Sequence, residues 1–191
     1  MVDAVIEGIK DRVSVAIKVN QSVGIQVPEN RHGDLLEALF NFMLSNPNDV
    51  WTFVTASDTY DHISKTFKEI SEHSNIKFID CISRAAGVSE LQSNCTYVES
   101  PTMLEIVSLE IKNNFRGVDN EVEKYIVIDS LSALMVYNDS EVIREFVSLL
   151  TSRTRSRNIH IVTILIEEEA ESNRLIQMND KIVVLRDSFI E

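Results

Sequence analysis

Cysteine is scarce in this sequence, which contains only Cys81 and Cys95 among its 191 residues. The two are not arranged as Cys-x-x-Cys, so the spacing typical of a structural zinc site or a dithiol redox motif is missing. Two isolated cysteines suit a reducing compartment, where we expect free buried thiols, with a disulfide between them as the alternative. The cysteine usage therefore favours a cytoplasmic protein without a zinc site.

Long apolar runs are also missing. No stretch approaches the roughly 20 consecutive apolar residues that a membrane-spanning helix needs. Residues 1–4 are acidic and lack the basic, apolar and small-residue pattern of a secretory signal. We therefore expect no association with a membrane.

Positive charge is in deficit. The chain has 18 lysine and arginine residues against 30 aspartate and glutamate residues, which gives a net charge of −12 and a pI of about 4.8. An acidic surface repels both nucleic-acid phosphates and the anionic leaflet of a membrane. We therefore expect nucleic acids not to be partners.

Strand and helix patterns alternate along nearly the whole chain, without repeats or an obvious linker. Apolar runs predict strands, and helical spacing of apolar residues predicts helices between them. The expected strands cover 22–27, 50–55, 76–81, 96–99, 125–129, 159–166 and 181–185, and the expected helices cover 34–44, 61–73, 101–115 and 140–155. Strands that are apolar throughout indicate a sheet covered on both faces. We predict one domain over residues 1–191, an α/β protein built as a three-layer α/β/α sandwich with a mainly parallel sheet.

The candidate chemistry lies in three loops. Ligands of parallel α/β sheets bind at the carboxyl ends of the strands, which here are followed by residues 28–35, 56–61 and 129–133. An aspartate at the end of a buried strand, such as Asp129, is where a nucleotide-binding protein holds Mg²⁺ and its waters. Ser130 beside it would then sense the phosphate. The alternative is a structural carboxylate that caps the next helix or binds backbone N–H groups.

Several segments, in order, resemble the RecA-type P-loop ATPases, and among them the KaiC-like branch common in archaea. They are residues 99–104 (ESPTML), 127–134 (VIDSLSAL), 144–150 (REFVSLL) and 179–185 (NDKIVVL). The resemblance covers most of the chain and implies a RecA-like P-loop NTPase fold. By the same resemblance, the nucleotide-binding positions fall on Asn30, Arg31, His32, Gly33, Asp129 and Ser130.

The phosphate loop departs strongly from the family pattern G-x-x-x-x-G-K-[ST], which falls on residues 28–35 (PENRHGDL). Only Gly33 remains, and Pro28 removes a backbone N–H donor. Asp34 replaces the lysine and Leu35 replaces the Mg²⁺-binding hydroxyl. At about 4 Å and an effective dielectric constant of about 20, a lysine–phosphate attraction is worth about 4 kcal/mol, and a carboxylate reverses its sign. Ordinary Mg-ATP binding is therefore disfavoured.

The loop after the second strand is altered as well. KaiC-like ATPases carry an acidic pair there that activates water, and this chain has Ser57 and Asp58 instead. If the protein were active, Asp58 would be the general base and Asp129 the metal ligand.

We therefore predict a catalytically inactive KaiC-like protein, a pseudo-ATPase without a cofactor, that acts as a regulatory or assembly module in signalling. The implied partner is another protein, either a second copy in an oligomer or an active KaiC-like paralogue. The alternative is an ATP-binding switch or weak ATPase that uses ATP and Mg²⁺. In it, Arg31 would replace the missing lysine.

Three arginines, Arg153, Arg155 and Arg157, close the helix predicted over 140–155. They are candidates for an anion site, a partner site or an arginine finger that reaches a neighbouring subunit. The alternative is that they are cations placed favourably at a helix C-terminus.

Overall fold

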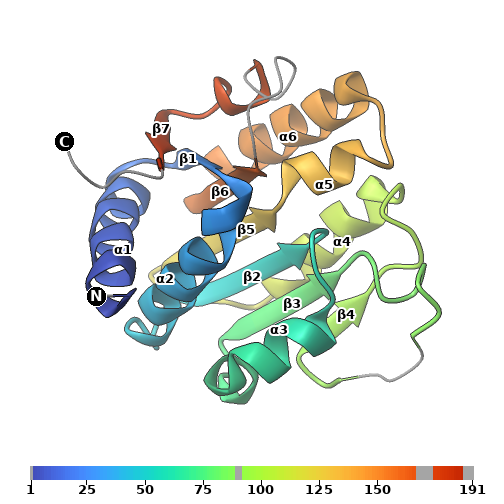
Figure 1. The fold of residues 1–191 in the computed structure, drawn as a ribbon. Coiled ribbons are helices and arrows are strands. Elements are labelled where there is room, and N and C mark those ends of the chain that lie inside the picture. The colour runs from blue at the N-terminus through green and yellow to red at the C-terminus, as the bar shows by residue number, and fades with distance from the viewer. Residues whose placement is uncertain (1, 89–91, 167–173, 187–191) are drawn as a thin grey trace.

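The computed structural model describes residues 2–88, 92–166 and 174–186 (Figure 1). Its helices are α1 (Val2–Val19), α2 (His32–Leu44), α3 (Tyr60–Thr66), α4 (Leu104–Asn114), α5 (Leu131–Met135) and α6 (Ser140–Arg155), with 3₁₀ turns η1 (Glu29–Arg31) and η2 (Lys68–Glu72). Its strands are β1 (Ser22–Val27), β2 (Val50–Thr55), β3 (Ile76–Asp80), β4 (Cys95–Tyr97), β5 (Lys124–Asp129), β6 (Ile159–Ile166) and β7 (Lys181–Val184).

The seven described strands form one sheet in the order β4-β3-β2-β5-β6-β1-β7. All neighbouring pairs are parallel, which confirms the predicted mainly parallel sheet. The register pairs Thr55 at the end of β2 with Asp129 at the end of β5. As a result, the residues that follow these two strands lie side by side.

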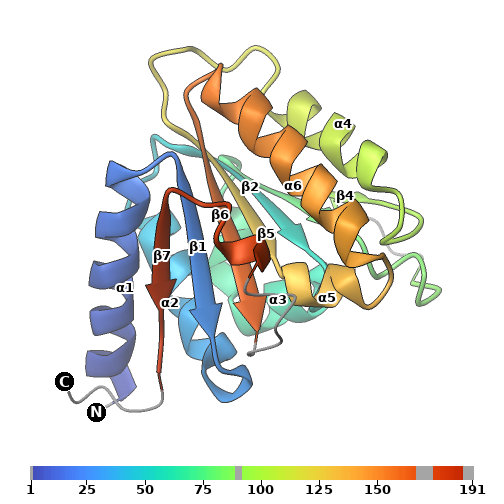
Figure 2. The ribbon, with the colours of Figure 1, turned by 90° about the horizontal axis from the view of Figure 1, so that it is seen from above.

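The helices form layers on both faces of the sheet (Figures 1 and 2), so the predicted α/β/α sandwich is confirmed. α1, α2 and α3 cover one face, and α4, α5 and α6 cover the other. Alternate residues of a strand point to opposite faces. Accordingly, Tyr125 and Val127 of β5 join the core under the first layer, and Ile126 and Ile128 join the core under the second.

Four elements begin and end where their patterns predicted: β1, β2, β6 and α6. α1 was not predicted, although it buries Ile6, Ile9, Val13 and Ile17 at helical spacing. It packs on the same face of the sheet as α2.

The helix predicted over 61–73 divides into α3 and η2. Phe67 leaves the helical conformation, with φ −116° and ψ 70°, and its ring packs against Phe40 at a centroid distance of 4.9 Å. The helix predicted over 101–115 begins only at Leu104. Ser100 accepts the backbone N–H of Thr102 and the two hydroxyls lie 2.8 Å apart, so a turn precedes the helix.

No helix among the described residues is both long enough and apolar enough to cross a membrane.

Candidate functional site

The candidate site lies at the carboxyl ends of β1, β2 and β5. β2 and β5 are direct neighbours, and only β6 separates β5 from β1. β1 is followed by α2 on one face of the sheet, whereas β5 is followed by α5 on the other. In α/β proteins, ligands bind at the strand ends near such a reversal of connections.

The segment after β1 is compact. Pro28 leads directly into η1, which the backbone N–H of Arg31 closes on the carbonyl of Pro28 at 2.9 Å. α2 then begins at His32. The chain therefore passes from strand to helix through a single 3₁₀ turn, not through a wide loop whose N–H groups surround a phosphate.

Asp129 is fully buried and accepts two side-chain hydrogen bonds. His32 Nε2 lies 2.6 Å from its Oδ1, and the Ser57 hydroxyl donates to its Oδ2 at 2.6 Å. The carbonyl of Asp129 also accepts the backbone N–H groups of Ala56 and Ser57. Three chain segments that are far apart in sequence thus meet at one carboxylate.

The contact with Asp129 changes the acidity of His32. Burial acts to lower the pKa of this imidazole, but the hydrogen bond and the negative charge of Asp129, together with the charge of Asp58, outweigh it and raise the pKa above 6.5. The side chain of His32 is 16% exposed and that of Asp129 is fully buried. The contact with the buried carboxylate therefore favours the charged form of His32 more than water does.

Ser57 was not predicted as a site residue. The signal that could have identified it is its position two residues after Thr55, the residue that pairs with Asp129. The arrangement is not a nucleophile triad, because Ser57 contacts the carboxylate and not the imidazole that would have to accept its proton.

Ser130 has a structural role in the described contacts. Its buried hydroxyl accepts the backbone N–H of Ala133 at 3.1 Å and so caps α5. The helix cap that we considered for Asp129 is therefore provided by the next residue. The peptide bond between the two is cis.

The remaining predicted site residues lie near this pair in the sequence or in space. Arg31 Nη1 is 3.1 Å from Asp34 Oδ2 within the first turn of α2. Asn30 and Gly33 are exposed. Asp58 is partly exposed, accepts the backbone N–H of Thr59 and lies 3.5 Å from His62. The assignment of nucleotide contacts to these residues, and of a base role to Asp58, stays a prediction.

Asp80, at the end of β3, is a second buried carboxylate that was not predicted as a site residue. It accepts the backbone N–H groups of Tyr60, Ile82 and Ser83 and the hydroxyl of Ser83. An apolar strand that ends in aspartate was the available signal, as for Asp129. Because its described partners are mostly backbone groups, Asp80 organises the turn after β3.

Comparison with known proteins places the chain in a family. A model described as a family of unknown function, DUF7504, matches residues 26–179. The chain belongs to the DUF7504 family. No curated protein sequence matches it.

Two solved structures share the fold of this DUF7504 member. The uncharacterized protein PH0321 from Pyrococcus horikoshii, determined in complex with an unknown peptide, superposes with a TM-score of 0.67 at 12% identity over 90% of this chain and 80% of its own. The KaiC-like protein PH0186 from Pyrococcus horikoshii OT3 gives 0.56 at 12% identity, over 90% and 74%. The expected KaiC-like, RecA-type α/β fold is thus confirmed, and at this identity the likeness concerns the fold alone.

The residues of this DUF7504 member are a poor fit to a Mg–triphosphate group. Both carboxylate oxygens of Asp129 already accept protein donors, so a cation there would have to displace His32 or Ser57. Asp34 adds a negative charge at the start of α2, at the position where the P-loop ATPase pattern G-x-x-x-x-G-K-[ST] has a lysine. Among residues 2–88, 92–166 and 174–186, no three His, Cys, Asp or Glu side chains are grouped so that they could hold a metal ion.

Proposed function

We propose that this protein is a non-hydrolysing KaiC-like module that acts by binding protein subunits, in regulation or assembly, and not by turning over ATP. The observation that carries the proposal is the pair of His32 and Asp129 at 2.6 Å. In the related ATPases that the sequence resembles, the carboxylate at this strand end serves a bound Mg²⁺. Here the imidazole of His32, whose charged form this contact favours, lies against the same carboxylate in the place of a bound cation.

The charges of the neighbouring turn support the same reading. Arg31, which would have to replace the missing lysine in an ATP-binding switch, lies against Asp34 of the same turn at 3.1 Å. A guanidinium that faces a carboxylate is less available to a triphosphate, because part of its charge is already balanced.

A protein-binding role is supported by one corner of the surface. Three apolar side chains there are largely exposed: Val136 by 77%, Tyr137 by 49% and Val142 by 46%. They line one hollow at the connection between α5 and α6. Neighbouring exposed apolar groups mark interaction sites more often than isolated ones do. PH0321, which shares the fold, forms a complex with an unknown peptide. We propose that this corner binds a KaiC-like subunit, either a second copy or an active paralogue in a signalling assembly.

Nucleotide binding is the first test. We expect millimolar Mg-ATP to leave the melting temperature of the purified chain unchanged, and ATP hydrolysis to stay at the rate of buffer alone. The alternative, an ATP-binding switch, predicts a rise in melting temperature that Arg31→Ala removes. Hydrolysis that Asp58→Ala abolishes would overturn the proposal.

Assembly is the second test. We expect light scattering to show an oligomer of the chain alone, or a mixed complex with an active KaiC-like ATPase whose turnover changes. Val136→Asp should weaken that association. Val15→Asp, at a 65% exposed valine of α1, is the matched control and should leave it unchanged. A chain that stays monomeric and does not affect the ATPase contradicts the proposed role.

A further inference from the structure

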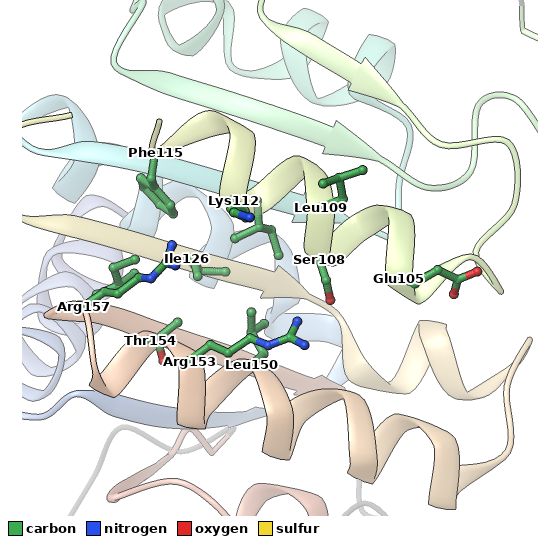
Figure 3. Close-up of a pocket in the computed structure, with 12 residues that line it drawn as sticks. Glu105, Ser108, Leu109, Lys112, Phe115, Ile126, Leu150, Arg153, Thr154 and Arg157 are labelled. Carbon is green, nitrogen blue, oxygen red and sulfur yellow. The ribbon is translucent and has the colours of Figure 1, made fainter. Parts of the chain in front are cut away.

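A pocket lies between α4 and α6, on the face of the sheet that α4, α5 and α6 cover (Figure 3). Its volume is about 410 Å³. Ile126 of β5 and Ile159 of β6 form its floor, and Ile111 and Leu150 line it from the two helices. This volume is at the small end of the range for small-molecule pockets, roughly 300–1,000 Å³. The pocket therefore suits a small organic molecule better than a segment of a macromolecule.

The pocket is separate from the site around Asp129. Ile126 stands three residues before Asp129 in β5, and Ile159 is the first residue of β6. The pocket therefore lies toward the amino-terminal ends of these strands, under the helical layer opposite to α2.

Three cationic side chains line the pocket: Lys112 from α4, Arg153 from α6 and Arg157 just after α6. Figure 3 shows the side-chain nitrogens of Lys112 and Arg157 directed toward the space over Ile126. Within the described parts of the chain, none of the three has an ion pair with an acidic residue. Arg155, which lies between Arg153 and Arg157 in the sequence, differs from them because it forms an ion pair with Asp180.

Such a cluster is unusual in a chain with a net charge of −12. Three neighbouring cations repel one another, and an anion bound among them would relieve that repulsion. Guanidinium groups bind carboxylate and phosphate oxygens through paired N–H donors. The only acidic residue of the lining, Glu105, is seven residues before Lys112 on α4, roughly 10 Å along the helix axis. The pocket thus combines cationic side chains with an apolar floor.

We propose that this pocket binds a small amphipathic anion, with an oxyanionic head group among Lys112, Arg153 and Arg157 and a compact apolar body over Ile126 and Ile159. The inference uses two of the three arginines at the end of α6. It assigns them a ligand role in addition to their favourable position at a helix C-terminus. It does not depend on the proposed function, because none of its residues contacts His32 or Asp129.

Isothermal titration calorimetry with octanoate tests the proposal directly. We expect saturable binding that tightens about fourfold for each added methylene in the series from hexanoate to octanoate. Octanamide, which has the same length without the charge, should bind at least about tenfold more weakly. Octyl phosphate distinguishes the head groups, since tighter binding than octanoate assigns the site to a phosphate.

Substitutions localise the binding. Arg153→Gln, Arg157→Gln and Lys112→Gln should each weaken octanoate binding about tenfold, which corresponds to about 1.4 kcal/mol. Arg155→Gln removes a cation from the same helix end outside the pocket and should leave the affinity unchanged. Leu109→Asp, at a 47% exposed position of the lining, should block binding without affecting the folded state, as circular dichroism can confirm.

Several outcomes would overturn the proposal. Equal binding of octanoate and octanamide would show that the cations do not contribute. An effect of Arg155→Gln as large as that of Arg153→Gln would show unspecific attraction. No binding of any probe at millimolar concentration, or binding only of a long acidic peptide, would equally reject a small-molecule site. The nucleotide tests change Arg31 and Asp58, which do not line this pocket, so the two sets of results are independent.

Discussion

Replacing His32 by alanine tests the internal ion pair directly. The substitution leaves Oδ1 of Asp129 without its 2.6 Å partner, while Ser57 still donates to Oδ2. Removal of one member of a buried pair costs about 3–5 kcal/mol. Because the imidazole is 16% exposed, water can reach part of the vacated space, and we expect about 3 kcal/mol. For a chain of this size that lowers the melting temperature by roughly 6–12 °C.

The pH dependence of this cost has a definite sign. The pKa of His32 is raised in the folded state above its unfolded value near 6.5. The charged form therefore stabilises the fold fully below the unfolded pKa, and that contribution is lost as the pH rises through the folded pKa. A neutral imidazole still forms a hydrogen bond worth about 1 kcal/mol. The difference in unfolding free energy between wild type and His32→Ala should thus be largest at about pH 5.5 and smaller at about pH 9, where only the hydrogen bond remains.

Urea unfolding at several pH values measures both quantities, provided that the m-values agree. His62→Ala is the matched control. Its side chain is 66% exposed and 3.5 Å from Asp58, so its removal should cost less than about 0.5 kcal/mol. Asp129→Asn should remove the pH dependence that His32→Ala removes, and the double variant should be less than additive. A cost that is constant with pH, or that grows as the pH rises, would refute the ion pair.

Three further predictions concern the rest of the fold. Asp80→Ala should lower the free energy of unfolding by about 3–5 kcal/mol in urea titrations, because three N–H groups, two of them in buried hydrogen bonds, lose their acceptor. Asp80→Asn keeps one carbonyl oxygen and should cost clearly less, so equal costs would contradict this role. Gly33→Ala should raise the free energy of unfolding by about 0.5 kcal/mol, since its added Cβ meets nothing within 4 Å. Gly24→Ala should lower it by about 1–3 kcal/mol, because the Cβ would lie 2.4 Å from Ile176 Cγ1. If Gly33→Ala were the more destabilising of the two, the backbone around one of these glycines would differ from this structure. Burial raises the pKa of the Cys81 thiol to about 12 and also raises the pKa of the Cys95 thiol. A thiol reagent near neutral pH should therefore label both cysteines slowly until urea is added. Rapid labelling of the native protein would argue against buried thiols.

Most strands and the amphipathic helix α6 could be predicted because their patterns are local. β1, β2 and β6 are mainly apolar, and α6 buries one stripe that includes Ile143, Val147 and Leu150. The same reasoning would have found α1, whose stripe is equally regular. Helix ends were less predictable. The start of α4 depends on the turn at Ser100, and the end of α3 depends on a contact between Phe67 and Phe40, which are distant in sequence.

The site could be predicted only in part. The altered phosphate loop identified His32 as a candidate, and the end of a buried strand identified Asp129. Their direct contact depends on the path of residues 28–31, which the sequence leaves open between a loop and a 3₁₀ turn. Ser57 required the strand order as well. Its contact with Asp129 exists because β2 and β5 are neighbours in the register that pairs Thr55 with Asp129, and neither fact is encoded locally.

The outermost described strands limit how this protein can associate. β4 has three residues and β7 has four, whereas the five strands between them have five to eight. Short edges offer few unpaired backbone groups to an incoming strand, and proteins use them to resist sheet-to-sheet aggregation. Extension of the sheet across subunits would gain few hydrogen bonds at either edge. Any assembly that this chain forms is therefore expected to use helix and loop surfaces.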